Sequence, residues 1–293
     1  MSRPRRPARR TLVAALAGAA LLVHGVTALA QARAEPEPGV NVGKPSALRN
    51  LVPAEGLEKQ AAQQYQQLKQ QAAEKRALAP DDHPQVLRLR AIAARMIPMA
   101  ARYNPRAAQW KWEINLIGSR TINAFCMPGG KIAFFSGILD ILKLTDDEVA
   151  MVMGHEIAHA LREHARARMA KSELTHLGAS ILGQMVAGGK FAGAFDAGGS
   201  LLTLKFSRDD ETDADLVGME LAARAGFDPR AGITLWQKMA AANKNAPPSW
   251  LSTHPSGPNR IREIEAQLPR AMPLYEQAPL RGKPLALAPA PAK

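Results

Sequence analysis

The pattern of apolar and polar positions predicts a mostly helical chain. A glutamine- and alanine-rich run over residues 54–77 favours helix, and a second helical pattern covers residues 84–103. Pro80 and Pro105 follow these two stretches and mark their ends. Two helices are therefore expected in the first part of the folded chain.

The pattern changes between Trp110 and Gly137. Aromatic and β-branched residues alternate there with polar ones, which is typical of strands. Pro128, Gly129 and Gly130 separate two such runs and predict a turn. We expect two or three short strands in this segment.

A long helix is predicted to begin at Thr145. Thr145 and Glu148 form the capping-box pattern Thr-x-x-Glu, and the helix that it opens is expected to run to about Met169. The fold class that follows is α+β, mostly helical, with a small β-sheet. Further helices are expected over residues 208–225, 229–242 and 258–268.

The first 32 residues read as a secretory signal peptide. Five arginines stand among the first ten residues, and no charged side chain lies between Arg10 and Arg33. A basic start, an apolar run and small residues around Ala30 and Ala32 are typical of such a signal, which would be cleaved after one of these two alanines. A single uncleaved N-terminal membrane anchor is the alternative, because about 20 apolar residues span a bilayer.

Composition also suggests the domain boundaries. Residues 33–53 are rich in proline and glycine and are expected to form a linker. A folded domain is expected over residues 54–268, followed by a disordered tail, rich in proline and alanine, over residues 269–293.

Charged residues interrupt the apolar stretch 177–204, so no transmembrane helix is expected after the signal. Its glycine-rich part, residues 187–199, is hypothesised to form a mobile cover over the site.

Charge and cysteine content argue against a nucleic-acid-binding protein and against a disulfide-stabilised one. The net charge is +12, but the five arginines of the signal contribute to it, and the rest of the chain has no basic cluster interleaved with aromatic residues. Nucleic-acid binding is therefore not expected. Cys126 is the only cysteine, so the chain has no internal disulfide, and this residue is expected to be a small apolar side chain of the core.

The sequence His155-Glu156-Ile-Ala-His159 carries the candidate chemistry. Two histidines four positions apart leave the same face of a helix and can bind one zinc ion. Glu156 lies where a carboxylate can reach a water molecule beside the metal and act as general base. This pattern predicts a zinc peptidase.

A catalytic zinc ion needs a third protein ligand. The metzincin spacing would require histidine at position 165, where the chain has Ala165, and His164 is out of register with the metal face. His164, together with His83 and His176, is expected to be a solvated surface residue. The acidic run Asp209-Asp210-Glu211-Thr212-Asp213-Ala214-Asp215 offers five carboxylates, and spacing alone does not distinguish a ligand among them from a solvated helix start.

Several motifs in one order resemble a known family. They are NAFCMPGGKIAFFSGIL, GHEIAHALREH, SRDDETDADLVG, AGFDP and STHPS followed by Arg260, between about Ala54 and Leu268. They resemble the zinc metallopeptidases that include the CAAX prenyl proteases and the HtpX-like heat-shock proteases. The resemblance is greatest to the soluble, exported bacterial branch of the beta-barrel assembly-enhancing proteases. It implies a gluzincin-like domain with one zinc ion per chain.

The resemblance also assigns roles to residues. It implies that Glu211 is the third zinc ligand beside His155 and His159, and that Asp215 supports a ligand from behind. It implies that His254 stabilises the oxyanion and that Arg260 supports that region. Asn123, Ala124 and Phe125 resemble the edge strand that pairs with an extended substrate.

Two functions follow as expectations. The first is a periplasmic zinc metalloendopeptidase that cleaves unfolded or misassembled envelope proteins, with polypeptides as substrates and outer-membrane assembly machinery as a possible partner. The second is a chaperone-like protein of the same fold that binds clients without hydrolysis and holds a gated or structural zinc. An intact Glu156 favours the first, because a binding protein needs no general base. Helical repeats such as some relatives carry after the protease are not expected, because the sequence ends about 25 residues beyond the last predicted helix, and Gly257, Pro258 and Asn259 replace the family's usual acidic residues.

Overall fold

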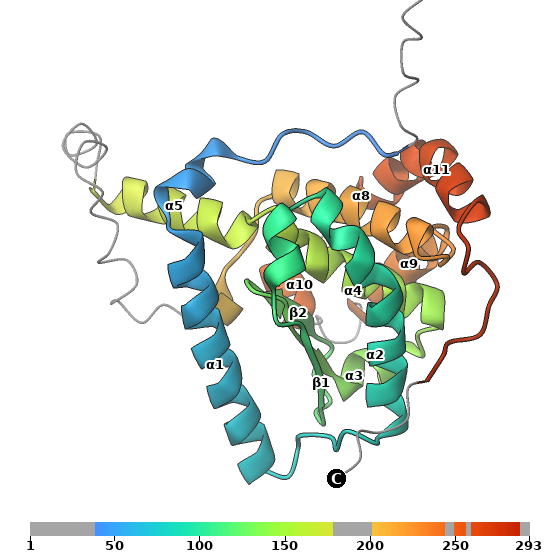
Figure 1. Ribbon diagram of the computed structural model, residues 1–293, viewed down its shortest axis with the longest axis horizontal. Helices are drawn as coiled ribbons and strands as arrows, with labels where there is room; N and C mark the ends of the chain where they lie inside the picture. The colour runs from blue at the N-terminus through green and yellow to red at the C-terminus, as the bar shows by residue number, and fades with distance from the viewer. Residues whose placement is uncertain (1–38, 178–200, 244–248, 256–258, 288–293) are drawn as a thin grey trace, which may run out of the picture. The chain divides into compact units, whose positions relative to one another are not determined.

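A computed structural model describes residues 39–177, 201–243, 249–255 and 259–287 (Figure 1). The predicted signal peptide, residues 1–32, and the glycine-rich stretch 187–199 lie outside the described residues. No helix within the described ranges is both long enough and apolar enough to cross a membrane. The fold is mostly helical with one small sheet, which confirms the expected fold class.

The helices follow the sequence patterns closely. Both helices expected in the first part of the chain are present, as are the three expected after residue 208, although residues 97–102 are a 3-10 helix and do not continue the second helix. The α-helices are α1 Ala54–Glu74, α2 Pro84–Met96, α3 Ser136–Leu142, α4 Asp146–Leu161, α5 His164–Leu177, α8 Arg208–Arg224, α9 Ala231–Asn243, α10 Ser249–Thr253 and α11 Arg260–Glu276. The 3-10 helices are η1 Ala47–Leu51, η2 Ile97–Arg102, η3 Pro105–Gln109 and η4 Leu201–Thr203.

The sheet has three strands in the order β1-β3-β2. Strand β3 (Lys131–Phe135) lies in the middle, parallel to β1 (Glu113–Ile117) and antiparallel to β2 (Ala124–Met127). The turn between β2 and β3 contains Gly129 and Gly130, whose φ angles of 83° and 77° favour glycine. Among the described residues β2 pairs with β3 alone, so β2 is an edge strand.

Helices cover both faces of the sheet. Ile132 and Phe134 of β3 belong to the main core with α2 and α4, whereas Ala133 faces the other way into a smaller cluster with Tyr65 of α1. This alternation is that of a strand buried on both faces. The sheet therefore lies between α1 on one side and the helices that carry the candidate site on the other (Figure 1).

Helices α4 and α8 form the centre of the domain, and both begin with a capping box. They approach closely at two glycines: a Cβ atom on Gly154 would lie 2.6 Å from the carbonyl oxygen of Gly218. Every residue of α4 from Glu148 to Leu161 is buried. This close crossing places the HEIAH residues against the acidic start of α8.

The chain breaks where one continuous helix was expected. Helix α4 ends at Leu161 and not near Met169, because Glu163 adopts a left-handed backbone with a φ of 58°. The chain then turns and continues as α5. The expectation of one helix through Met169 was wrong.

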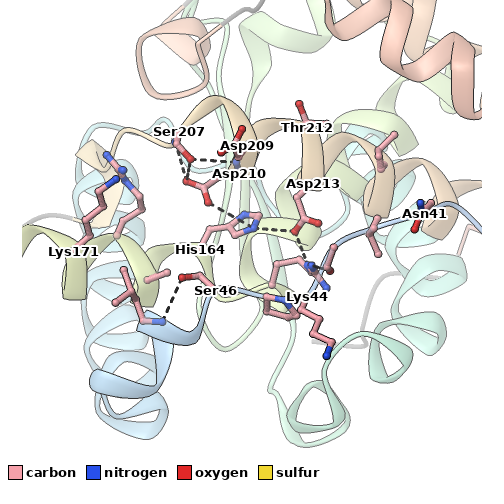
Figure 2. A pocket seen from close by; sticks show the side chains of 18 of the residues that line it. Asn41, Lys44, Ser46, His164, Lys171, Ser207, Asp209, Asp210, Thr212 and Asp213 are labelled. Atoms are coloured by element: carbon pink, nitrogen blue, oxygen red, sulfur yellow. Dashed lines mark hydrogen bonds and ion pairs between the residues drawn. The ribbon is translucent and has the colours of Figure 1, made fainter. Parts of the chain in front are cut away.

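Residues outside the expected domain boundaries also pack on the domain. The segment expected to be a linker buries Val40 and Val52, and its η1 lies against α5. Figure 2 shows Asn41, Lys44 and Ser46 of this segment beside α5 and α8. Residues 39–53 are therefore not a free linker, because Val40 and Val52 are buried and the backbone N–H of Val40 bonds to Glu220.

The last helix is longer than expected. Helix α11 continues past Leu268 to Glu276 despite the prolines at 269 and 273. Ala271 and Leu274 are buried in the main core, and this packing holds the last turns in place. The start of the expected disordered tail, residues 269–276, is therefore helical.

Candidate metal centre

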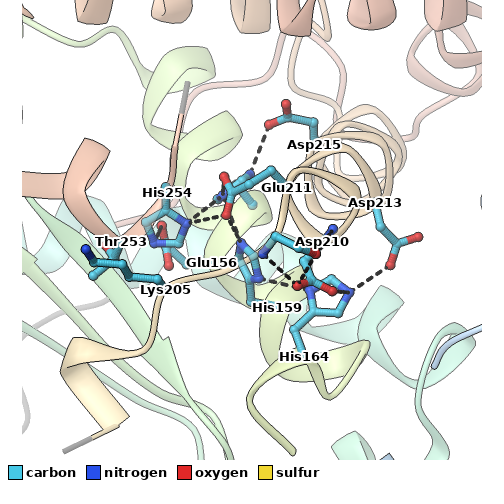
Figure 3. A network of polar contacts seen from close by, with 12 residues as sticks. Glu156, His159, His164, Lys205, Asp210, Glu211, Asp213, Asp215, Thr253 and His254 are labelled. Carbon is cyan, nitrogen blue, oxygen red and sulfur yellow. Dashed lines mark hydrogen bonds and ion pairs between the residues drawn. The ribbon is translucent and has the colours of Figure 1, made fainter. Parts of the chain in front are cut away.

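Four side chains with metal-binding atoms meet where α4 crosses α8. His155 and His159 stand one turn apart on α4, Glu211 lies in the first turn of α8, and His254 directly follows α10. Each offers one donor atom, and these four atoms lie within 4.8 Å of one another. Figure 3 shows His159, Glu211 and His254 directed toward one point.

The separations match those around a single ion. Nε2 of His155 lies 3.1 Å from Nε2 of His159 and 3.3 Å from Nδ1 of His254. The carboxylate oxygens of Glu211 lie 3.0 Å from Nδ1 of His254, 3.4 Å from Nε2 of His159 and 3.5 Å from Nε2 of His155. Ligands bonded at about 2.0–2.1 Å to a tetrahedral zinc ion are about 3.3 Å apart. Three imidazoles and one carboxylate at these distances fit such an ion.

Electrostatics at this point favour a positive charge. His155, His159 and Glu211 are all buried, and Nε2 lone pairs that face each other repel unless a cation lies between them. Burial alone would lower the pKa of His155, but hydrogen bonds to Asp215 and Glu211 raise it to about 9. Burial alone would raise the pKa of Glu211, and the surrounding histidines instead hold it far below its usual range. The cluster is thus suited to bind a cation.

A carboxylate and an arginine stand behind His155. Oδ1 of Asp215 lies 2.9 Å from Nδ1 of His155, and Arg260 donates to both oxygens of Asp215 at 2.6 Å. Arg260 also donates to Oε2 of Glu211 at 2.6 Å, and its guanidinium lies 3.8 Å from the ring centre of Trp236. Such a carboxylate fixes the ring and tautomer of the histidine, so that Nε2 is left for a metal.

Glu156 lies beside the cluster but supplies none of its four donor atoms. Its Oε1 accepts a hydrogen bond of 2.6 Å from Nε1 of Trp250 and lies 3.7 Å from Nε2 of His254. The side chain is buried. Glu156 therefore lies next to the donor atoms without being one of them.

Comparison with known proteins identifies the family of this chain. The model of peptidase family M48 matches residues 85–268, from the start of α2 into α11. The chain belongs to peptidase family M48. Zinc is the metal of the M48 metallopeptidases, and the cluster can hold one ion, so the expected cofactor is confirmed.

The similar M48 proteins include mitochondrial metalloendopeptidases and a bacterial protease. Mitochondrial metalloendopeptidase OMA1 of Schizosaccharomyces pombe is 35% identical over 204 residues, which are 66% of this chain and 56% of the relative. Mitochondrial metalloendopeptidase OMA1 of Arabidopsis thaliana is 38% identical over 151 residues, 52% of this chain and 30% of the relative. The putative beta-barrel assembly-enhancing protease of Vibrio cholerae is 32% identical over 170 residues, 54% of this chain and 35% of the relative. The chain spans less than two thirds of the length of these relatives.

Most of the residues that the sequence singled out lie close together in the structure. His155, His159 and Glu211 each supply one donor atom, Asp215 contacts His155, and Arg260 contacts both carboxylates. His254, expected at the oxyanion, offers Nδ1 to the donor set, and its Nε2 is the nitrogen nearer to Glu156.

Two residues beside the donor cluster were not anticipated from the sequence. Trp250 was not singled out, although it lies one helical turn before His254. His164 was expected to be solvated, and this was wrong: its side chain is 4% exposed and its Nδ1 lies 2.9 Å from Nδ1 of His159. The left-handed Glu163 turns His164 back toward the site, which a continuous helix could not do.

The edge strand of this M48 domain borders the centre. A cavity of about 50 Å³ is lined by Asn123, Ala124 and Phe125 together with Glu156 and His159. Phe135 donates its backbone N–H to the carbonyl of Asn123, so alternate residues from Asn123 onward pair with β3. The backbone groups of Ala124 and Cys126 therefore point to the open edge.

Proposed function

We propose that this protein is an exported zinc-dependent metalloendopeptidase that hydrolyses peptide bonds in unfolded or misassembled envelope proteins. The position of Glu156 carries the proposal. It projects from the same helix as two donor histidines, borders the cavity beside β2, and is not itself one of the four donors. A protein that only bound clients would have no use for a carboxylate in this position.

The proposed reaction is hydrolysis with Glu156 as general base. His155, His159 and Glu211 would hold the zinc ion, which when bound would polarise the peptide carbonyl and lower the pKa of a nearby water molecule to about 7. Glu156 takes a proton from the attacking water and delivers it to the leaving amine. Trp250 holds Oε1 of Glu156 at 2.6 Å, which leaves Oε2 to carry the proton.

His254 has two positions in this proposal. In the described conformation it completes a set of four donors, whereas a catalytic zinc site keeps one coordination position open. We infer that His254 leaves the donor set when substrate enters, and that its ring then donates a hydrogen bond to the oxyanion that develops on the peptide carbonyl. Arg260 keeps Glu211 and Asp215 in place during this change.

Substrate binding is proposed along the edge of β2. An extended peptide adds to an open edge through main-chain hydrogen bonds. Cys126 offers its outward N–H and carbonyl, and Ala124 offers its carbonyl, because the N–H of Ala124 already donates to the side chain of Asn123 at 3.0 Å. Phe125 packs into the smaller core cluster on the α1 side of the sheet. Recognition of this kind tolerates many sequences, which suits a protease that acts on unfolded chains.

The chaperone-like alternative has one observation in its favour. Four protein donors within 4.8 Å are the number that a structural zinc site uses. In this alternative His254 stays in the donor set, the zinc is structural or gated, and clients bind along β2 without being cut.

The location and domain limits are part of the proposal. The basic and apolar first 32 residues support export through a cleaved signal, into the periplasm if the cell is bacterial. We propose a peptidase domain that spans residues 54–268, supported on both sides by residues that pack on it. A relative named a putative beta-barrel assembly-enhancing protease suggests outer-membrane assembly machinery as a partner.

The decisive experiment measures zinc content and casein cleavage for the mature chain and for Glu156→Gln. The peptidase proposal predicts one zinc ion in both proteins and a loss of cleavage of about 10²- to 10⁴-fold in the variant, the usual contribution of a general base. Zinc in both proteins and cleavage by neither would overturn it in favour of the chaperone-like function. Suppression of client aggregation, equal in the two proteins, would then be the expected activity.

A further inference from the structure

His164 connects the donor His159 to a charged pair. Nδ1 of His164 lies 2.9 Å from Nδ1 of His159, and Nε2 of His164 lies 3.1 Å from Oδ2 of Asp213. Oδ1 of Asp210 lies 4.0 Å from the same Nε2. Arg162 donates to Oδ2 of Asp213 at 2.5 Å. Figure 3 shows His159, His164 and Asp213 in this sequence.

The two imidazoles can share their hydrogen in only one way if His159 binds a metal. Nε2 of His159 faces the donor cluster, so its lone pair must be free and Nδ1 must carry the hydrogen. Nδ1 of His164 must then accept that hydrogen. A neutral His164 that accepts at Nδ1 has its own hydrogen on Nε2, and Asp213 accepts it there. The carboxylate at the far end therefore selects the tautomer of both rings.

We propose that His164 is a positioning residue for the metal: with Asp213 it holds His159 in the tautomer and orientation that present Nε2 to the ion. The inference rests on the proposed zinc site. It adds a second hydrogen-bonded support for a donor histidine, His164 and Asp213 for His159, to the one that Asp215 gives to His155. The first support is direct, since Asp215 contacts His155 without an intervening ring. Both supports end in an arginine, Arg260 for Asp215 and Arg162 for Asp213.

The backbone is arranged to make this contact. In a continuous helix a residue five positions after His159 would point about 140° away from it, since each residue advances the helix by about 100°. The left-handed Glu163, a conformation that is rare for a residue with a side chain, interrupts the helix immediately before His164. Arg166 and Arg49 pair with the carboxylate of Glu163. The turn therefore has side-chain partners of its own.

The support ends at a polar cavity. Arg162, His164 and Asp213 line a cavity of about 590 Å³ between the N-terminal segment, α5 and α8, as Figure 2 shows for His164 and Asp213. His159 does not line it. A change at Asp213 therefore alters the outer end of the support and leaves the packing around the four donors unchanged.

The test is zinc affinity, measured by competition with a chromophoric chelator on the full mature chain. His164→Leu removes the acceptor and should weaken zinc binding by 10- to 100-fold, the usual effect of losing a partner of a metal-binding histidine. His164→Asn should stay within a few-fold of wild type, because the amide oxygen of asparagine replaces Nδ1 as acceptor. Asp213→Asn should give an intermediate loss, because an amide no longer fixes the direction of the hydrogen bonds.

A matched control separates this role from general stability. His83 caps α2 by accepting the N–H of Gln85, away from the cluster. His83→Leu should lower the thermal midpoint of unfolding and leave zinc affinity unchanged. Equal zinc affinity for wild type and His164→Leu would overturn the inference while the proposed peptidase function stands.

Nitrogen-15 NMR of the zinc-loaded wild type gives an independent answer even if His164→Leu fails to fold. The hydrogen of His164 should reside on Nε2, and a hydrogen on Nδ1 would overturn the inference. Neither readout depends on catalysis. If the wild type binds zinc but does not cleave casein, the proposed function is wrong, and the zinc affinities of the His164 variants still test this inference. If the wild type binds no zinc, both the proposed function and this inference are wrong.

Discussion

Nε1 of Trp250 donates a hydrogen bond of 2.6 Å to Oε1 of Glu156. The indole is buried, stacks on Trp236 with ring centres 5.4 Å apart, and lies 5.2 Å from the ring centre of His155. The backbone N–H of Trp250 bonds to the carbonyl of Ile122, just before the edge strand. One residue thus connects the proposed general base, the donor cluster and the approach to β2.

Trp250→Phe is expected to lower the rate of peptide cleavage by about 10- to 150-fold. Phenylalanine keeps most of the packing but has no N–H, so the carboxylate of Glu156 loses the donor that orients it, and one hydrogen bond to a charged group contributes about 1.5–3 kcal/mol. Zinc content should not change, because Trp250 is not among the donors. The measurement is kcat on a peptide substrate together with zinc per chain. A variant that cuts at the wild-type rate would show that Trp250 only packs the site.

Much of the fold could be predicted because local patterns determine it. The capping box at Thr145 and Glu148 and the glycine turn after β2 both depend on neighbouring residues, and each was found where expected. The HEIAH spacing likewise determines which two histidines share a helix face. These features need no knowledge of distant contacts.

Other features depend on contacts between distant segments. His164 is buried because a strained turn at Glu163 directs it toward His159 and Asp213, and residue spacing gave no sign of that turn. Val40 belongs to the domain because its backbone N–H reaches Glu220, 180 positions later in the chain. Residue spacing alone does not distinguish Glu211 from the other acidic residues of α8, because only the crossing with α4 places it beside His155 and His159.

Asp215→Asn is expected to weaken zinc binding by 10- to 100-fold. The amide keeps the size of the side chain but loses the charge that pairs with Arg260, and it no longer fixes the hydrogen of His155 on Nδ1. Chelator competition measures the effect. Asp209→Asn is the matched control, because Asp209 is exposed on the same helix and should leave the affinity unchanged. Equal losses in the two variants would point to overall charge and not to Asp215.

Gly218→Ala is expected to destabilise the protein by about 1–3 kcal/mol or more, the usual range for adding volume to a packed core. The new Cβ atom would lie 2.5 Å from the backbone nitrogen of His155, so α4 and α8 must move apart. Urea denaturation should show the loss of stability, and zinc affinity should fall with it because the donors sit on both helices. Gly43→Ala is the control, since its Cβ atom would meet nothing within 4 Å.

Cys126→Pro is expected to raise KM for extended peptides about fivefold, since one net hydrogen bond contributes about 1 kcal/mol. Proline removes an N–H that points to the open edge of β2 and leaves the pairing with β3 intact. Cys126→Ala keeps the N–H and should behave as wild type. Steady-state kinetics on a peptide series gives the comparison, and equal KM values in all three proteins would exclude main-chain binding at this position.

Glu148→Gln is expected to make stability less dependent on acidic pH. Burial alone would raise the pKa of Glu148, but hydrogen bonds from Lys238, the N–H of Thr145 and the hydroxyl of Thr234 lower it below its ordinary value of 4.5. A carboxyl group with a lowered pKa in the folded state stabilises the protein above its unfolded-state pKa, and this stabilisation disappears as the pH falls through the folded-state pKa.

The variant should therefore be less stable than wild type by about 1–3 kcal/mol at pH 7, because the charge-assisted bonds to the start of α4 are weakened. The difference should shrink as the pH falls below 4.5. Urea denaturation at a series of pH values measures both proteins. A difference that stays constant down to the acid transition would mean that Glu148 acts through its shape and hydrogen bonding alone, since protonation of the wild-type carboxyl would then cost nothing.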